Sequence, residues 1–284
     1  MLFIERFQRK TRENPQGHMT AIGHRAGPAA RHLPDPRSKA PDPGFPLIDG
    51  PHYYDVLAAL HEILTPEWYF EIGTNRGGSL KVCPGKFVAI DPEFIFKTFA
   101  MGPRAEGHFF QLTSDDFFAQ DFLGRTGIRP ALGFLDGMHL FEFLLRDFIA
   151  FERRAAPGAM AILHDCLPFD QAMTEREWDG RKTRLWTGDV WKTLQILMRH
   201  RPDLQFDMLD AWPTGLVLVR GLDPENRVLP EVYDAVVAEF MATDIGRFGP
   251  EAYYGQFEIQ SSFSAIEAMR AKGRAGPAAI QTET

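Results

Sequence analysis

The chain has 284 residues, of which 44% are hydrophobic and 24% are charged, and its formal net charge is −7. This composition is typical of a globular protein and excludes a chain that is disordered or fibrous as a whole. The net acidity argues against nonspecific nucleic-acid binding, and no apolar run approaches the roughly 18 residues that span a bilayer. A small-molecule ligand and no membrane partner are therefore expected. The N-terminal sequence lacks the apolar core of a secretory signal, so the expected location is cytoplasmic.

The first 49 residues differ in composition from the rest of the chain. They hold 7 of the 21 prolines and carry 8 basic against 5 acidic side chains, so the remainder has a formal charge of −10. Prolines at this density disfavour a regular helix or a central strand. Residues 1–49 are therefore expected to form a flexible arm. The pattern leaves open whether this arm is a linker or a clasp on a second subunit of a homo-oligomer.

Residues 50–222 alternate between helical and strand patterns. An amphipathic helix is expected between Pro51 and Pro66, followed by five short apolar runs that end in polar or glycine residues. Strands that alternate with helices predict a parallel sheet with helices on both faces. The five expected strands are residues 68–72, 87–90, 108–112, 131–135 and 160–163.

The clearest later helices are expected at about residues 139–154 and 189–200, whereas the first crossover, 76–84, has room for little more than two turns. The runs 204–209 and 216–219 are too close together for a parallel crossover, so they are expected to pair antiparallel. The fold class is thus α/β, a Rossmann-like doubly wound sheet of seven strands, mostly parallel, with an antiparallel C-terminal hairpin. Residues 223–284 are expected to form a helical extension, with helices at 231–242 and 259–269 and a frayed tail from Ala271. This extension could contact a second subunit or cover an edge of the sheet.

A glycine-rich turn follows the first expected strand. The segment Glu71-Ile72-Gly73-Thr74-Asn75-Arg76-Gly77-Gly78-Ser79 places an acid just before the glycines, and Asp91 follows Gly73 by 18 residues. Glycines permit positive φ and a close approach of the backbone to a ligand, and an acid at this spacing can reach ribose hydroxyls. The E-x-G-x-x-x-G spacing is not the G-x-G-x-x-G of pyrophosphate binders, which argues against a nicotinamide-dependent oxidoreductase. An ordinary turn with Asp91 as a cap is the structural alternative.

Two further polar motifs follow the fourth and fifth expected strands. They are Asp136-Gly137-Met138-His139 and His164-Asp165-Cys166. Because the carboxyl ends of parallel strands lie at one edge of a sheet, these side chains are expected to converge on one crevice. His139 is the first candidate for a general base and His164 the second, since histidine titrates near neutral pH. A helix cap is the alternative role of His139.

The strand layout, the glycine-rich turn and Asp91 together resemble the class I S-adenosylmethionine-dependent methyltransferases. The D-G-x-H and H-D motifs resemble the macrolide and rhamnosyl sugar O-methyltransferases and related hydroxylase-like proteins, over roughly residues 67–222. The resemblance implies S-adenosylmethionine as cofactor and O-methylation of a hydroxylated small molecule such as a sugar or natural product. The cofactor-binding candidates that it implies are Glu71, Gly73, Thr74, Asn75, Gly77, Gly78, Ser79, Asp91, Ser114 and Asp115.

The resemblance also implies a reaction site with Asp136, His139 and His164 as catalytic candidates and with Asp136 and Asp165 as ligands of a divalent cation such as Mg²⁺. His164 stands where relatives often have an acid, which favours a softer metal or a metal-free site. Ser114 and Asp115 stand where the family contacts adenine, although a helix cap fits them equally.

The long polar segment 167–187 follows the fifth strand. It is expected to be a lid whose Arg176, Trp178, Arg181 and Arg184 contact a polar or anionic substrate, or else a solvated run of charges. A second hypothesis from another class remains open, in which the chain is a noncatalytic cofactor-binding or assembly protein that keeps the methyltransferase fold.

Overall fold

The computed structural model describes residues 35–96, 104 and 106–275 and contains an eight-stranded sheet in the order β3-β2-β1-β4-β5-β7-β6-β8. The strands are β1 (Trp68–Ile72), β2 (Lys86–Ile90), β3 (Gly107–Phe110), β4 (Leu132–Leu135), β5 (Met160–His164), β6 (Gln205–Leu209), β7 (Leu216–Arg220) and β8 (Ile259–Gln260). The first five strands are parallel, and β7 is antiparallel to both β5 and β6. The expected doubly wound sheet with an antiparallel hairpin is confirmed.

The expected number of seven strands is wrong, because Ile259–Gln260 adds β8 beside β6. The helix expected at 259–269 begins only at Ser262, as α10 (Ser262–Ala275). A strand of two residues is too short to show an alternating pattern, so its sequence reads as the start of the helix that follows it. The frayed tail was expected from Ala271, but α10 continues to Ala275, and residues 276–284 lie outside the described part.

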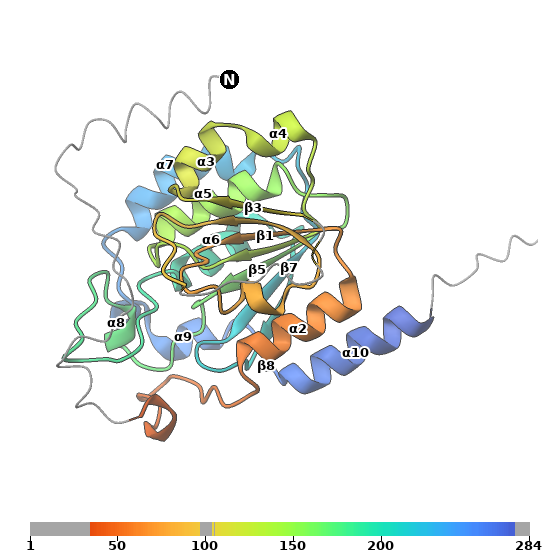
Figure 1. Ribbon diagram of the computed structural model, residues 1–284. Coiled ribbons are helices and arrows are strands. Elements are labelled where there is room, and N and C mark those ends of the chain that lie inside the picture. The colour runs from red at the N-terminus through yellow and green to blue at the C-terminus, as the bar shows by residue number, and fades with distance from the viewer. Residues whose placement is uncertain (1–34, 97–103, 105, 276–284) are drawn as a thin grey trace, which may run out of the picture.

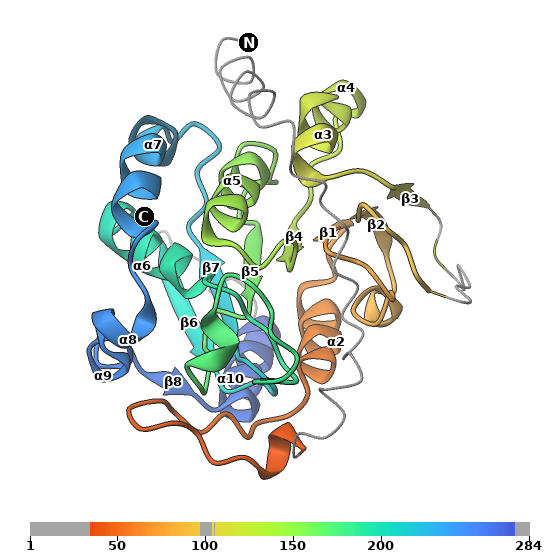
Figure 2. The ribbon, with the colours of Figure 1, turned by 90° about the vertical axis from the view of Figure 1, so that its left-hand side faces the viewer.

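Helices cover both faces of the sheet (Figures 1 and 2). On one face, α2 (Tyr53–Leu64) and α10 pack over side chains such as Tyr69 and Phe87. On the other face, α3 (Ser114–Ala119), α5 (Phe141–Glu152), α6 (Trp191–His200) and α7 (Val228–Phe240) pack over Phe70 and Val88. Successive side chains of a strand point to opposite faces, so each buried strand contributes to both cores. The shorter helices are η2 (Pro36–Ser38), η3 (Leu80–Val82), α4 (Phe122–Thr126), η4 (Ala172–Thr174), α8 (Ile245–Phe248) and α9 (Pro250–Tyr254).

The first crossover is shorter than the two turns that the sequence suggested. It contains only η3, a single 3-10 turn, before Pro84. The Arg104 guanidinium donates hydrogen bonds to the carbonyl oxygens of Leu80, Lys81 and Cys83, which a longer helix would use itself. This long-range contact, together with Pro84, explains why the helix stops so early. Among the described residues, no helix has the length and apolar character needed to cross a membrane.

Both ends of the described chain contact the central part of the fold. The Asp42 backbone N–H donates to the Phe169 carbonyl, Asp42 Oδ2 accepts from the Gln171 backbone, and Lys39 lies 3.0 Å from Asp170. The described residues of the expected arm therefore lie along the loop after β5, while 1–34 are outside the described part. At the other end, β8 extends the sheet beside β6, and α10 packs against α2.

A buried carboxyl on α5 makes stability depend on pH. Burial raises the pKa of Asp147 from 3.8 to about 7, and the nearby Asp115 carboxylate adds to the rise. The folded state keeps a proton that the unfolded chain loses above about pH 4, so the unfolding free energy falls as pH rises from about 4 to about 7. At about 1.4 kcal/mol per pKa unit, this loss amounts to at most about 4 kcal/mol.

The variant Asp147→Asn cannot ionise, so its unfolding free energy is expected to fall less than that of the wild type between pH 4.5 and 8. The difference should be about 2 to 4 kcal/mol, measured by urea denaturation at both pH values. Parallel pH profiles for the two proteins would contradict this account of Asp147.

Candidate active site

The candidate site lies at the carboxyl ends of the parallel strands, where the strand order reverses between β1 and β4. The backbone of Asp136, just after β4, donates to the Ile72 carbonyl at the end of β1 (3.0 Å). His164 is the last residue of β5, the neighbour of β4, and Asp165 follows it. A reversal of strand order opens a crevice at this edge, which is the usual place for a ligand in an open α/β sheet.

The glycine-rich turn runs directly against the exit of β4. Gly73 has φ +87°, and a Cβ atom there would lie 1.8 Å from the carbonyl oxygen of Asp136. Gly77 has φ +68°, and a Cβ atom at Gly78 would lie 2.0 Å from Tyr54 Oη. Gly73 is thus required for a close approach of two backbone segments, and Gly77 for its left-handed conformation. The glycine-rich turn is therefore in direct backbone contact with the D-G-x-H segment.

Two acids flank this turn. Glu71 is fully buried, accepts a hydrogen bond from Tyr69 Oη (2.6 Å), and has its pKa raised by burial to about 7. The nearby Thr74 and Ser79 side chains partly oppose this rise. Asp91 accepts from the backbone N–H groups of Asn75 and Glu93, both at 2.8 Å. Since each carboxylate oxygen can accept two hydrogen bonds, Asp91 keeps acceptor capacity for ribose hydroxyls.

The candidates after β3 are placed at the start of α3. Thr113, one residue before them, is the N-cap and accepts from the Asp116 backbone (3.1 Å). Ser114 is the first helical residue, and the Asp115 carboxylate accepts from Nε and Nη2 of Arg146, at 3.0 and 2.6 Å. The Asp115 carboxylate thus links α3 to α5 by an ion pair, and Thr113 is the N-cap of α3.

The four polar residues of the two motifs converge, as expected. Nδ1 of His164 lies 3.2 Å from Asp136 Oδ1 and 3.2 Å from Asp165 Oδ1. His139 closes the ring, with Nε2 at 3.3 Å from Asp136 Oδ1 and Nδ1 at 3.2 Å from Asp165 Oδ2. The result is a closed cluster in which each imidazole lies between two carboxylates.

The cluster is buried, and its charges depend on one another. Burial alone would lower the pKa values of His139 and His164, but the adjacent Asp165 and Asp136 carboxylates raise them to about 9 and about 10. The two imidazoles in turn hold the pKa values of Asp136 and Asp165 below their usual range against the effect of burial. The mutual pairing of imidazoles and carboxylates thus favours the charged form of each group.

The donor set of the cluster fits a metal ion. One ligand atom each from Asp136, His139 and Asp165 lies within 4.8 Å of the others. Carboxylate oxygens suit hard cations such as Mg²⁺, whereas imidazole nitrogen favours transition metals such as Mn²⁺, Fe²⁺ or Zn²⁺. His139 and Asp165 have φ of 27° and 63°, which are uncommon for residues other than glycine. Such backbone strain is often found at functional sites.

The segment after β5 is largely bound to its own chain. The Arg176 guanidinium pairs with Glu142 and with Asp189, and Arg181 pairs with Asp179. Trp178 Nε1 donates to the Thr183 carbonyl (3.2 Å). In this arrangement the two arginines have carboxylate partners of their own chain, and the contact of these side chains with a substrate stays a prediction. Arg184 is exposed.

Sequence reasoning missed three residues that touch the cluster. The Trp186 ring stacks on His139 with centroids 5.2 Å apart, and the Tyr53 ring lies 4.4 Å from that of His164. Thr214 Oγ1 donates to Asp165 Oδ1 (2.5 Å). The only local signal was the Trp186-Thr187-Gly188-Asp189 sequence just before α6, which combines an aromatic residue with a turn glycine.

Comparison with protein-family models gave no match, and neither did comparison with curated proteins. Similar solved structures include an O-methyltransferase from Bacillus cereus in complex with SAH, at 16% identity over 62% of this chain and 84% of that one, with a TM-score of 0.44. An SAH-bound methyltransferase from Podospora anserina has 15% identity over 60% and 78%, with a TM-score of 0.44. The O-methyltransferase TomG from Streptomyces achromogenes, in complex with SAM, has 16% identity over 60% and 80%, with a TM-score of 0.41. These values are too low to carry an argument about function, which rests on the residues of the site.

Proposed function

We propose that the protein is a class I S-adenosylmethionine-dependent methyltransferase that methylates a hydroxyl group of a small molecule such as a sugar or natural product. One observation carries the proposal. The glycine-rich turn, with Asp91 beside it, abuts the cluster of Asp136, His139, His164 and Asp165. The reactive end of a nucleoside cofactor bound at the turn would therefore lie beside the carboxylate and imidazole groups of this cluster, which can accept and donate protons.

The residues of the turn suit the parts of S-adenosylmethionine. Asp91 would accept from the ribose hydroxyls, and the Glu71 carboxyl group is an oxygen acceptor beside the turn for an ammonium group. When bound, the cofactor would supply a methyl group that passes from its sulfonium to the acceptor oxygen by in-line displacement, with S-adenosylhomocysteine as the leaving group. The chain contributes the positions of cofactor and acceptor, and such positioning accounts for much of the rate in displacements of this kind.

The cluster would bind the acceptor hydroxyl and receive its proton. His139 is the proposed base, with Nε2 facing Asp136, but an imidazole with a pKa near 9 carries a proton at neutral pH. A cation held by Asp136 and Asp165 would offset the carboxylate charge that retains this proton, and would lower the pKa of a bound hydroxyl. We therefore include a divalent cation in the proposal, with Asp136 and Asp165 as its ligands.

Calorimetric titration tests the proposal in its simplest form. The wild type should bind S-adenosylmethionine and not NAD, and added Mn²⁺ or Mg²⁺ should bind in an EDTA-sensitive manner. Release of S-adenosylhomocysteine should then follow when a panel of sugars and phenols is offered. Tight cofactor binding without turnover on any acceptor would instead support a noncatalytic cofactor-binding protein, and binding of NAD alone would refute the cofactor assignment.

The role of Asp91 can be isolated with a ribose analogue. Asp91→Ala should weaken S-adenosylhomocysteine binding about 10- to 150-fold, because hydrogen bonds to a charged group contribute about 1.5–3 kcal/mol. The wild type should bind the 2′,3′-dideoxyribose analogue of this ligand more weakly by a similar factor. In the variant this discrimination should disappear, since the partner of the hydroxyls is gone. Equal discrimination in both proteins would show that Asp91 does not contact the ribose.

A further inference from the structure

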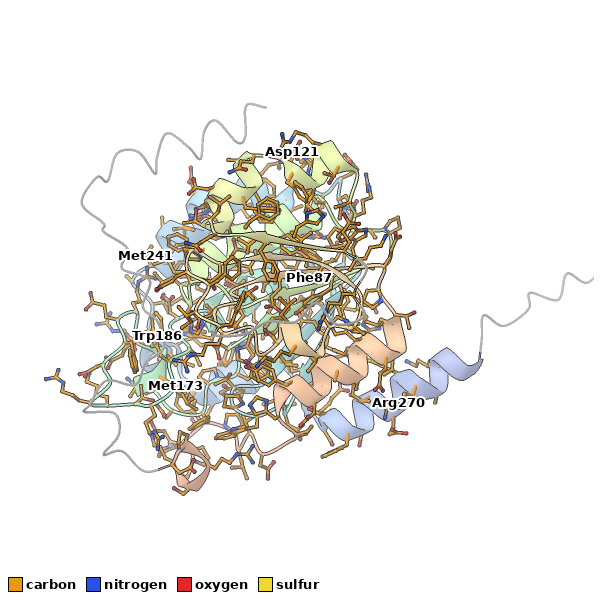
Figure 3. All side chains as sticks on the ribbon, viewed as in Figure 1. Phe87, Asp121, Met173, Trp186, Met241 and Arg270 are labelled. Atoms are coloured by element: carbon orange, nitrogen blue, oxygen red, sulfur yellow. The ribbon has the colours of Figure 1, made fainter. Side chains whose placement is uncertain are left out.

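The segment from Trp186 to Asp189, just before α6, lies against His139 and the residues that follow it. Trp186 is labelled in Figure 3 on the same side of the molecule as Met173, and the Met173 carbonyl accepts from the backbone N–H groups of Thr187 (3.0 Å) and Gly188 (3.1 Å). Trp186 Nε1 also donates to the Glu175 carbonyl (2.6 Å). The segment is therefore fixed to the loop after β5 before it meets His139.

The backbone of this segment restrains the backbone around His139. Gly188 has φ +55°, and a Cβ atom there would lie 1.7 Å from the carbonyl oxygen of His139. Two residues beyond His139, the Phe141 N–H donates to Asp189 Oδ1 (3.0 Å), and Asp189 is held by Lys192 (2.7 Å). These contacts hold His139 at its unusual φ of 27° and explain why α5 begins at Phe141 instead of at 139.

The same segment restrains the imidazole itself. Nδ1 of His139 lies 2.7 Å from the Trp186 carbonyl oxygen, closer than its 3.2 Å distance to Asp165. A carbonyl oxygen can only accept, so Nδ1 must carry the hydrogen. The other ring nitrogen, Nε2, then faces Asp136 Oδ1 at 3.3 Å. The Trp186 ring, stacked at 25°, keeps the imidazole in this plane.

We propose that Trp186 and Gly188 are positioning residues that hold the His139 ring in place, with Nδ1–H donated to the Trp186 carbonyl and Nε2 facing Asp136. The catalytic meaning of this inference rests on the proposed function, whereas the placement of the His139 ring does not. Partners that orient a histidine in this manner commonly change activity or metal affinity 10- to 100-fold when removed. Trp186 would act only through His139.

Nuclear magnetic resonance of protein labelled with [¹⁵N]histidine tests the inference without cofactor or turnover. The wild type should show a His139 Nδ1–H signal that is slow to exchange and ring protons shifted upfield by the indole, both assigned by their loss in His139→Gln. Trp186→Ala should lose the upfield shift and speed Nδ1–H exchange at least 10-fold. Trp186→Phe, which keeps a stacking ring, should retain most of both effects.

Measurement of enzymatic activity provides the second test. For Trp186→Ala, kcat should fall about 10- to 100-fold while the Kd of S-adenosylmethionine stays within about 2-fold, and Trp186→Phe should recover most of kcat. Gly188→Ala should disturb the His139 signals, whereas Gly158→Ala should not, because Gly158 has φ +74° but no atom within 4 Å of the added carbon. Unchanged His139 signals in Trp186→Ala would overturn the inference. Altered signals in a protein that binds no S-adenosylmethionine would instead uphold it and refute the proposed function.

Discussion

Replacing Gly73 by alanine is expected to unfold part of the glycine-rich turn and to remove most of the affinity for S-adenosylmethionine. The added Cβ would lie 1.8 Å from the carbonyl oxygen of Asp136 and 2.5 Å from its carbonyl carbon. Both are backbone atoms, so no side-chain rotation relieves the overlap. A left-handed φ adds about 1–2 kcal/mol for any residue with a Cβ. We expect a total loss of about 3 kcal/mol or more in unfolding free energy, since overpacking adds about 1–3 kcal/mol.

The variant Gly127→Ala is the matched control for this prediction. Gly127 follows α4 with φ +72°, and no atom lies within 4 Å of a Cβ placed there. It should therefore show only the left-handed cost of about 1–2 kcal/mol and bind the cofactor as the wild type does. Urea denaturation and calorimetric titration of both variants measure the difference. Equal losses in the two variants would mean that the turn does not approach Asp136 this closely in solution.

The parts of the fold that carry the site were predictable because their signals are local. The buried run of β1 ends at Ile72 with an acid and glycines next to it, and β4 and β5 are apolar runs that end in Asp136 and His164. Since neighbouring parallel strands end at one edge, the meeting of these side chains followed from the strand order alone. The glycine spacing likewise indicated a close backbone approach before the approaching atom could be known.

The remaining features depend on contacts between residues far apart in sequence. His139 and Trp186 are 47 residues apart, and the Asp115–Arg146 pair spans 31. No period or motif links such residues, so the sequence could not distinguish a helix cap from an ion pair as the role of Asp115. The early end of η3, beside Arg104, has the same cause. The role of Asp115 and the length of the first crossover helix thus depend on tertiary contacts that local sequence patterns do not reveal.

The substitution Asp136→Asn is expected to reduce methyl transfer about 10²- to 10⁴-fold, the usual contribution of a proton-transfer group and its partners. Asp136 Oδ1 lies 3.3 Å from His139 Nε2 and 3.2 Å from His164 Nδ1, so its negative charge acts on both imidazoles. An amide of the same shape removes that charge and weakens any cation site that includes the carboxylate. The Asp136 backbone, which contacts Gly73, stays in place, so the glycine-rich turn should be preserved.

Cofactor binding and turnover must therefore separate in this variant. Asp136→Asn should keep the Kd of S-adenosylmethionine within a few-fold of the wild type, while release of S-adenosylhomocysteine falls with the best acceptor of the sugar and phenol panel. Asp207→Asn is the matched control, because Asp207 on β6 pairs with Arg220 (2.7 Å) on β7, outside the cluster. It should keep full turnover. Undiminished turnover in Asp136→Asn would exclude the cluster from the chemistry, and a parallel loss of cofactor binding would show that Asp136 supports the turn instead of the reaction.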